Sequence, residues 1–268
     1  MEITRETVAV ITGGASGMGR ATALAMARRG ASVVIADLNA ERIADTVAEL
    51  NSVGVGALGV RCDVGNPDDI QHLRDKTIEQ FGHVDILMNN AGVLPIGDID
   101  KTPLSEFDRT MRINFMAVVC GVQTFLPDLA ARGQAHIINT SSLAATFAYD
   151  PATIAYNASK AAVFSFTESL ALAVAAKGIG VTCLIPGPVA TNIMEQVTVS
   201  GELRGMPGAY ASEHFPLRTA EEVGELVAEA VSNNTFFLPT NDGVTSLLAR
   251  HAAEPDAFLR EIQAWLAG

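Results

Sequence analysis

Short apolar runs alternate with helical patterns along this chain. Residues 7–12 (TVAVIT) form a continuous apolar run rich in β-branched side chains. Such a run is typical of a strand that is covered on both faces, as in a parallel sheet. The same pattern predicts further strands at residues 32–36, 57–61, 84–88, 135–139, 180–185 and 236–238.

The stretches between these runs carry helical spacing and helix-boundary signals. Asn66 and Pro67 predict a helix start, because asparagine caps helix N-termini and proline fits the first turn, and Gly82 marks the end of this helix. Thr219 begins another helix, with acidic residues in its first turn. The other expected helices follow Gly19 or cover residues 40–50, 104–131, 156–177, 244–252 and 256–266.

Strands that alternate with helices imply right-handed βαβ units. We therefore expect an α/β fold: a single Rossmann-like, doubly wound parallel sheet with helices on both faces. No charge run, low-complexity linker or repeat divides the chain, so one domain is expected over residues 1–268.

Two segments of the final third depart from the alternation. Residues 192–216 form a glycine-dotted insertion that contains Met194, Met206, Tyr210 and Phe215. Long loops at a ligand-binding edge often act as lids, so we predict a mobile substrate lid, with a packing loop as the alternative. Residues 244–267 are expected to form a helical C-terminal tail.

The composition indicates which binding partners and which cellular compartment to expect. Hydrophobic residues make up 49% of the 268, enough for a sizeable core, and the net charge of -12 argues against nucleic acid as a partner. The cysteines and histidines show neither disulfide nor metal-ligand spacing, so no metal is expected. The polar first residues contain no signal peptide, and the apolar runs are short of a membrane span. We expect a cytoplasmic protein with no membrane partner.

A glycine cluster, Gly13-Gly14-Ala15-Ser16-Gly17-Met18-Gly19, follows the first predicted strand and precedes a helix. In this setting glycines permit a tight turn and the close approach of a diphosphate, and the new helix offers free N–H groups. A Walker loop is excluded, because no Gly-Lys-Ser/Thr follows. The cluster predicts phosphate binding, with a tight structural turn as the alternative.

Asp37 ends the second predicted strand, eighteen residues beyond Gly19. An acidic side chain at this point accepts hydrogen bonds from an adenosine ribose and repels a 2′-phosphate. Leu38 and Asn39 bring no positive charge, and the nearest arginine is Arg42. The pattern favours NAD over NADP. The alternative is that Asp37 caps a helix, a role that Asn39 also suits.

Polar residues gather where the predicted strands end. The carboxyl ends of parallel strands meet at one edge of the sheet, where ligands bind. We therefore expect a single ligand site at this edge, which brings together the glycine turn, Asp37, Asp63, Asn90, Ser142 and Thr191.

Tyr156 and Lys160 lie four residues apart in a predicted helix, and therefore on one helix face. A tyrosine with a pKa of about 10 is a poor base at neutral pH, but an adjacent ammonium lowers that pKa. Such a pair can exchange a proton near physiological pH. The alternative is a half-buried tyrosine beside a solvated lysine.

Together these residues resemble the single-domain type of the short-chain dehydrogenase/reductase family. The resemblance implies an NAD(H)-dependent oxidoreductase that interconverts a secondary alcohol and a ketone. The tyrosine-to-lysine spacing differs from that of the related enoyl reductases. The matching motifs run in family order from about residue 7 to 192: Thr12-Gly13-x-x-x-Gly17-x-Gly19, Asp37, Asp63-Val64, Asn89-Asn90-Ala91-Gly92, Asn114, Ser142, Tyr156-x-x-x-Lys160 and Pro186-Gly187.

The resemblance also implies catalytic roles. Tyr156 is the expected acid/base, Lys160 lowers its pKa and binds the nicotinamide ribose, and Ser142 holds the substrate oxygen. Asn114 matches a residue that completes a water relay to Lys160, and its alternative role is to pin an irregular turn. Ser142 precedes Tyr156 by fourteen residues, one more than is usual in the family, so we expect a longer loop. Ser141 is the competing residue, and capping the loop is the alternative role of Ser142.

The resemblance also implies which residues contact NAD, besides Asp37, Tyr156 and Lys160. The diphosphate is expected at Gly13, Ser16, Gly17 and Met18, and the adenine at Asp63 and Val64. The ribose is expected beside Asn90, Ala91 and Gly92, and the nicotinamide beside Pro186, Gly187, Val189 and Thr191.

The C-terminal third leaves other possibilities open. Many family members end in an Asp-Gly-Gly motif, whereas Asn241-Asp242-Gly243 here leads into predicted helices. The usual C-terminal subunit packing is therefore open, although a homodimer or homotetramer is the family expectation. Alternative functions are a reductase of a carrier-bound β-keto ester, a sugar-epimerase-like enzyme, and an NAD(H)-binding sensor or scaffold without turnover.

Overall fold

A seven-stranded parallel sheet forms the centre of the protein, which is described here by a computed structural model covering residues 1–191, 193, 195, 197–201 and 208–267. The strand order is β3-β2-β1-β4-β6-β7-β9. Each predicted strand is present, with ends within two residues of those expected. The strands are β1 (Val8–Thr12), β2 (Ser32–Asp37), β3 (Ala57–Arg61), β4 (Ile86–Asn89), β6 (Ala135–Thr140), β7 (Ile179–Ile185) and β9 (Phe237–Pro239).

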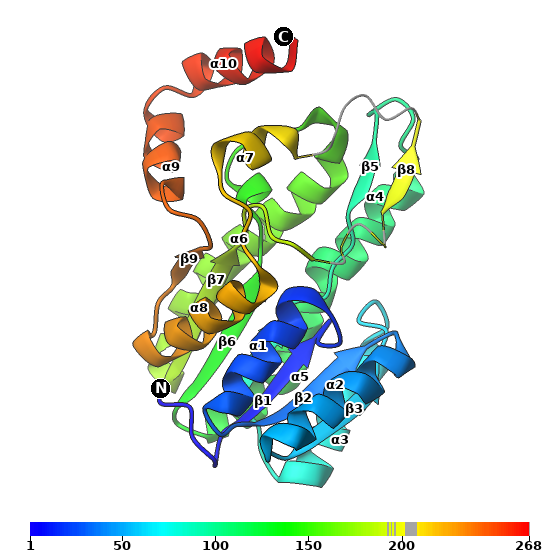
Figure 1. The fold of residues 1–268 in the computed structure, drawn as a ribbon, viewed down its shortest axis with the longest axis vertical. Helices are drawn as coiled ribbons and strands as arrows, with labels where there is room; N and C mark the ends of the chain where they lie inside the picture. Colours follow the sequence, from blue (N-terminus) through cyan, green and yellow to red (C-terminus); the bar gives the residue numbers. More distant parts are fainter. Residues whose placement is uncertain (192, 194, 196, 202–207, 268) are drawn as a thin grey trace.

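Helices cover both faces of this sheet (Figure 1). One face is packed by α1 (Gly17–Arg28), α2 (Ala40–Val53) and α8 (Ala220–Asn233), and the other by α3 (Pro67–Phe81), α5 (Ala117–Ala131) and α6 (Ile154–Val174). Successive strand residues point to opposite faces, so Ala9 and Ile11 join the first core and Val10 joins the second. The predicted doubly wound α/β fold is confirmed.

Side-chain caps begin three of these helices. Asn66 accepts a hydrogen bond from the Asp68 N–H at the start of α3, and Pro67 occupies the first turn, as predicted. Thr219 and Glu222 form a reciprocal capping box at the start of α8. The start of α2 is capped by Asn39, so Asp37 is not the cap of this helix.

The predicted continuous helix over residues 104–131 is interrupted. It consists of α4 (Leu104–Met111), a π-helical turn η1 (Arg112–Met116) and α5. The side chain of Asn114 in this turn bonds to both backbone groups of Val93, which lies on another segment. A tertiary hydrogen-bond pair therefore holds the widened turn in place.

The sequence patterns did not reveal several short elements. Residues of the predicted lid form β8 (Thr198–Ser200), which pairs in parallel with β5 (Pro95–Gly97), and α7 (Ala209–His214). Short 3-10 turns also occur, including η2 (Leu143–Ala145), η3 (Pro151–Thr153) and η4 (Ala175–Lys177). Met194 and Met206 of the predicted lid lie outside the described residues.

The C-terminal tail is helical, as predicted, and forms α9 (Val244–Ala253) and α10 (Pro255–Ala267). These helices pack on α7 and on the loop after Ser142 in a third hydrophobic cluster. In this cluster the indole of Trp265 meets the ring of Tyr210 edge to face at 5.3 Å and donates a hydrogen bond to Glu213.

Two helical stretches, Leu104–Ala131 and Pro151–Lys177, are long and apolar enough to cross a membrane by length and composition alone. This finding corrects the expectation that every apolar run is too short. Core helices of soluble proteins pass the same test, and these stretches carry the buried polar residues Asn114 and Lys160. They do not indicate a membrane protein.

A close crossing of α1 and α8 yields a stability prediction. A Cβ atom at Gly224 would lie 2.6 Å from the carbonyl carbon and oxygen of Ala21, so Gly224→Ala must push the helices apart. We expect a loss of about 1–3 kcal/mol in the free energy of unfolding, measured by urea denaturation. The control is Glu229→Ala, at an exposed position on the same helix. Equal stability of both variants would contradict the close crossing.

Candidate active site

The glycine turn between β1 and α1 is shaped by contacts that exclude side chains. Gly13 and Gly17 have φ angles of +61° and +50°, in the left-handed region that favours glycine. A Cβ atom at Gly19 would lie 2.2 Å from the Gly13 carbonyl oxygen. Since α1 begins at Gly17, its first N–H groups face this turn. Such a turn fits a diphosphate.

Thr191 lies directly over this turn. A Cβ atom at Gly17 would stand 3.2 Å from the Cβ of Thr191. The segment that follows β7 therefore returns to the glycine turn, which contains Ser16 and Met18.

The carboxylate of Asp37 is fixed at the end of β2. One oxygen accepts a hydrogen bond from the Ala15 N–H and the other from the Asn39 N–H, each at 3.2 Å. The carboxylate is thus tied to the glycine turn at the position expected for a ribose. Asp63, after β3, is exposed and accepts a hydrogen bond from the Gly65 N–H at 2.9 Å.

Asn90 joins three strand ends. Its amide donates to the carbonyl oxygens of Thr12 and Gly13 at 3.1 and 3.2 Å, and its own carbonyl oxygen accepts from the hydroxyl of Thr140 at 3.3 Å. The Thr12 hydroxyl accepts from the N–H groups of Asn90 and Ala91. The expected ribose border is therefore built into the sheet edge.

Lys160 is a buried cation at the centre of the site. Its side chain enters from α6 and is 3% exposed, and Nζ donates to the Thr140 carbonyl oxygen at 2.8 Å. Burial lowers the pKa of this lysine to about 8. A Cβ atom at Gly92 would lie 3.4 Å from Nζ, so the absence of a side chain there leaves the ammonium accessible to the ribose border.

Tyr156 stands one helical turn before Lys160, and its ring centre lies 5.8 Å from Nζ. Burial raises the pKa of the Tyr156 phenol, and a side-chain hydrogen bond with Ser142 acts in the opposite direction. The expected lowering by Lys160 is not found in this structure. The physical reason is that the ammonium bonds to the Thr140 carbonyl, while desolvation penalises the phenolate.

The neighbouring serines have different partners. Ser142 faces Tyr156, whereas the hydroxyl of Ser141 donates to the backbone carbonyl of Lys160 at 2.8 Å. Ser142 also caps η2 by accepting from the Ala144 N–H at 3.1 Å. Of the two candidates, the structure therefore brings Ser142 to the tyrosine, and its capping bond fixes the position of the hydroxyl.

The amide of Asn114 is fully used in holding the site together. It accepts from the Val93 N–H at 2.8 Å and donates to the Val93 carbonyl and the Ser159 hydroxyl, each at 3.0 Å. The Ser159 hydroxyl in turn donates to the Tyr156 carbonyl at 2.7 Å. Asn114 thus pins the irregular turn, while the water relay stays a prediction.

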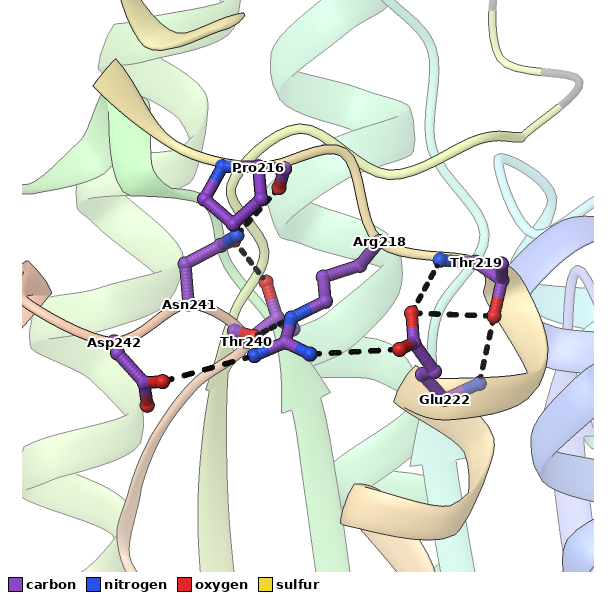
Figure 2. A network of polar contacts seen from close by, with 7 residues as sticks. All are labelled: Pro216, Arg218, Thr219, Glu222, Thr240, Asn241 and Asp242. Carbon is purple, nitrogen blue, oxygen red and sulfur yellow. Dashed lines mark hydrogen bonds and ion pairs between the residues drawn. The ribbon is translucent and has the colours of Figure 1, made fainter.

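The turn that starts at Pro186 is bonded to Thr240, a member of the polar network in Figure 2. The Gly187 N–H donates to the Thr240 hydroxyl at 3.0 Å, and this hydroxyl donates to the side-chain oxygen Oδ1 of Asn241 at 2.9 Å. The Asn241 amide donates to the Pro216 carbonyl at 2.7 Å, where the predicted lid ends. Arg218 donates to the Thr240 carbonyl at 3.1 Å.

A backbone pairing completes this connection. Val189 forms a parallel bridge with Arg218, whose N–H donates to the Pro188 carbonyl and whose carbonyl accepts from the Ala190 N–H. The expected nicotinamide turn and the end of the predicted lid are therefore one rigid unit with β9. Sequence reasoning missed Thr240 and Asn241, although polar residues directly after a strand were the signal used elsewhere.

Aromatic side chains form a wall beside the catalytic cluster. The ring of Tyr149 stacks on Tyr210 of α7 at 6.1 Å and contacts Phe147 at 5.6 Å. Burial, and to a lesser degree the charge of Tyr156, raises the pKa of Tyr149. His214 stacks on Tyr210 at 4.0 Å.

The arrangement can bind a dinucleotide along the sheet edge and present Ser142 and Tyr156 to an oxygen atom next to it. Among the described residues, no group of three or more His, Cys, Asp or Glu side chains could hold a metal ion. The residues that the sequence placed at this edge come together there, with Asp63 at its solvent-exposed end.

Known proteins are similar to this chain in sequence and fold. The family model for short chain dehydrogenase matches residues 7–200. The chain is 35% identical to the 1-deoxy-11-beta-hydroxypentalenate dehydrogenase of Streptomyces exfoliatus over 236 residues, covering 87% of this chain and 82% of the relative.

Two similar crystal structures differ in their dinucleotide. A short chain dehydrogenase/reductase from Burkholderia phymatum in complex with NAD has a TM-score of 0.84 and 31% identity, covering 96% of each chain. A short chain dehydrogenase from Burkholderia cenocepacia in complex with NADP has a TM-score of 0.81 and 29% identity, covering 91% of this chain and all of the other. The match of sequence and fold over most of its length shows that this chain belongs to the short-chain dehydrogenase/reductase family.

Proposed function

We propose that this protein is an NAD(H)-dependent oxidoreductase that interconverts a secondary alcohol and a ketone, with Tyr156 as acid/base. The observation that carries the proposal is the convergence of Ser142, Tyr156 and Lys160 at the sheet edge, next to the glycine turn. A sensor or scaffold without turnover is not favoured, because a protein that only binds a dinucleotide has no need of a buried lysine beside a tyrosine.

The proposed cofactor site fits the residues present. A turn that side chains would fill accepts the diphosphate, and the fixed carboxylate of Asp37 accepts the ribose hydroxyls. Pro186, Gly187, Val189 and Thr191 would hold the nicotinamide end. When bound, the dinucleotide supplies or accepts the hydride, whereas the chain supplies orientation and proton transfer.

The proton would move through the phenol of Tyr156. In alcohol oxidation, the phenolate oxygen takes the substrate hydroxyl proton while the Ser142 hydroxyl donates to the substrate oxygen. In ketone reduction, the phenol returns a proton to that oxygen. Lys160 would hold its ammonium near the ribose border and favour the phenolate electrostatically once the site is filled. Asn114 would position the turn beside Lys160.

The aromatic wall supports a mostly apolar or cyclic substrate. We propose residues 192–216 as its lid and one domain for the whole chain. The strongly exposed apolar side chains of Leu104 on α4 and Leu172 on α6 support a homodimer or homotetramer. A cytoplasmic location is proposed from the composition and from family membership.

Removal of the proposed acid/base tests the reaction directly. Tyr156→Phe should lower kcat for oxidation of secondary alcohols about 10²–10⁴-fold, because the proton acceptor is lost. NADH formation would be followed over linear, cyclic and aromatic alcohols. Titration with NADH is the control, since the variant should bind the dinucleotide. Retention of most of the rate would remove Tyr156 from the proposed role.

We expect Lys160 to lower the free energy of unfolding, because its ammonium is buried in the folded protein. Its pKa falls from 10.5 to about 8 in the folded state, so the unfolded chain binds more protons between these values. Lys160→Met should raise the free energy of unfolding at pH 7 by up to about 3 kcal/mol. This advantage should shrink as the pH rises from 8 to 10.5, while turnover is lost.

The stability advantage of the Lys160→Met variant is measured by urea unfolding at several pH values. A variant that is less stable than the wild type at pH 7, with a difference that is independent of pH, would show that the lysine is not held at a desolvation cost.

Cofactor preference is expected to depend on Asp37. Replacing the carboxylate and adding a cation, in Asp37→Ser/Leu38→Arg, should shift the ratio of kcat/KM values toward NADP by at least about tenfold. The ratio is measured with one alcohol at constant ionic strength. An unchanged ratio would assign the selecting contact to other residues.

A further inference from the structure

An ion pair connects the predicted lid (residues 192–216) with the start of α2, beside Asp37, where the adenosine ribose is expected. Arg42 lies in the first turn of α2, and its Nη2 atom is 2.7 Å from Oε2 of Glu195, which follows β7. The two residues are 153 positions apart in sequence. Both side chains keep solvent access, with 39% and 49% of their surface exposed.

Arg42 stands close to the carboxylate of Asp37. The hydrogen bond and charge of Glu195 have the largest effect in raising the pKa of Arg42, and the charge of Asp37 also raises it. The N–H of Arg42 bonds to Asn39, which also bonds to Asp37. Arg42 is the only cationic residue between positions 37 and 42. Its guanidinium is therefore the available partner for a 2′-phosphate on a ribose bound at Asp37.

We propose that Glu195 is a cofactor-specificity residue that keeps Arg42 from binding the 2′-phosphate of NADP. This inference rests on the proposed function, because it requires a dinucleotide at this edge. The pair occupies the guanidinium with the Glu195 carboxylate, and the same guanidinium also interacts with the charge of Asp37. A 2′-phosphate must then displace Glu195 from Arg42 and approach two carboxylates. NAD has no such group and meets neither obstacle.

The selectivity effect does not require the pair to stabilise the fold. Exposed ion pairs contribute little to stability, because the charges are well solvated when they separate. The affinity for a competing anion does depend on the pair. Removal of Glu195 converts a neutral ion pair into a free guanidinium, which can bind a phosphate through two hydrogen bonds. In such a variant, Arg42 should become a ligand of the 2′-phosphate.

The test is direct binding of NAD⁺ and NADP⁺, measured by calorimetry at about 0.1 M ionic strength, where exposed charges still interact. The variants are Glu195→Gln and Glu195→Gln/Arg42→Gln. We expect Glu195→Gln to raise the affinity for NADP⁺ relative to NAD⁺ about tenfold, an order-of-magnitude estimate for one charge-assisted contact. The double variant should lose this gain.

A matched control is Glu261→Gln. Glu261 pairs with Arg250 at 2.7 Å, with similar exposure, between α10 and α9. Figure 1 shows these helices at the opposite end of the molecule from α2. This variant frees an arginine and changes the net charge by the same amount, and it should leave the affinity ratio unchanged.

Three results would overturn the inference: an unchanged ratio in Glu195→Gln, a gain that survives in the double variant, or an equal change for both dinucleotides. A wild type that already prefers NADP⁺ would also overturn it. Failure of the wild type to bind either dinucleotide would instead refute the proposed function, and the inference with it. Binding of NAD⁺ with an unmoved ratio refutes the inference alone.

Discussion

The parallel hydrogen-bonded register of the central sheet determines where the polar side chains of the site stand. Thr12 pairs with Ala36, Asn89 with Asn139, and Ile185 with Pro239, so the strands end together although they come from distant parts of the sequence. The pairing of the strands therefore places each polar residue that follows a strand at the same edge of the sheet. The glycine turn, Asp37 and the Pro186 turn reach this edge through the register, and their own hydrogen bonds then fix their geometry.

At that edge, buried polar groups hold the site together by forming hydrogen bonds with one another. The ammonium of Lys160 bonds to a strand carbonyl, and Asn114 ties α6 to the segment after β4 through Ser159 and Val93. Below them, Asn89 donates to Asn139, which donates to Thr167. Unpaired polar groups at this depth would be costly, so these hydrogen bonds fix the geometry of the catalytic cluster.

Local patterns were sufficient for much of this architecture. Strand runs, the caps at Asn66 and Thr219, and the convergence of Ser142 with Tyr156 follow from short-range spacing and from motif order. The π-helical turn was anticipated only as the alternative role of Asn114, because it depends on a hydrogen bond between Asn114 and Val93, 21 residues away. The pairing of β5 with β8 joins three-residue strands about a hundred positions apart, too short for a periodic signal. The raised pKa of Tyr156 depends on burial, which four-residue spacing does not reveal.

The side chains of the aromatic wall come from parts of the chain that are synthesised at different times. Phe258 and Trp265 pack against Phe147 and Tyr210, yet Phe258 follows Tyr156 by 102 residues. During synthesis, the strands from β1 to β7 and the glycine turn can form while the tail has not yet left the ribosome. The aromatic wall closes only after the C-terminal helices have emerged. In a nascent chain, the glycine turn can therefore be ordered before the aromatic wall is complete.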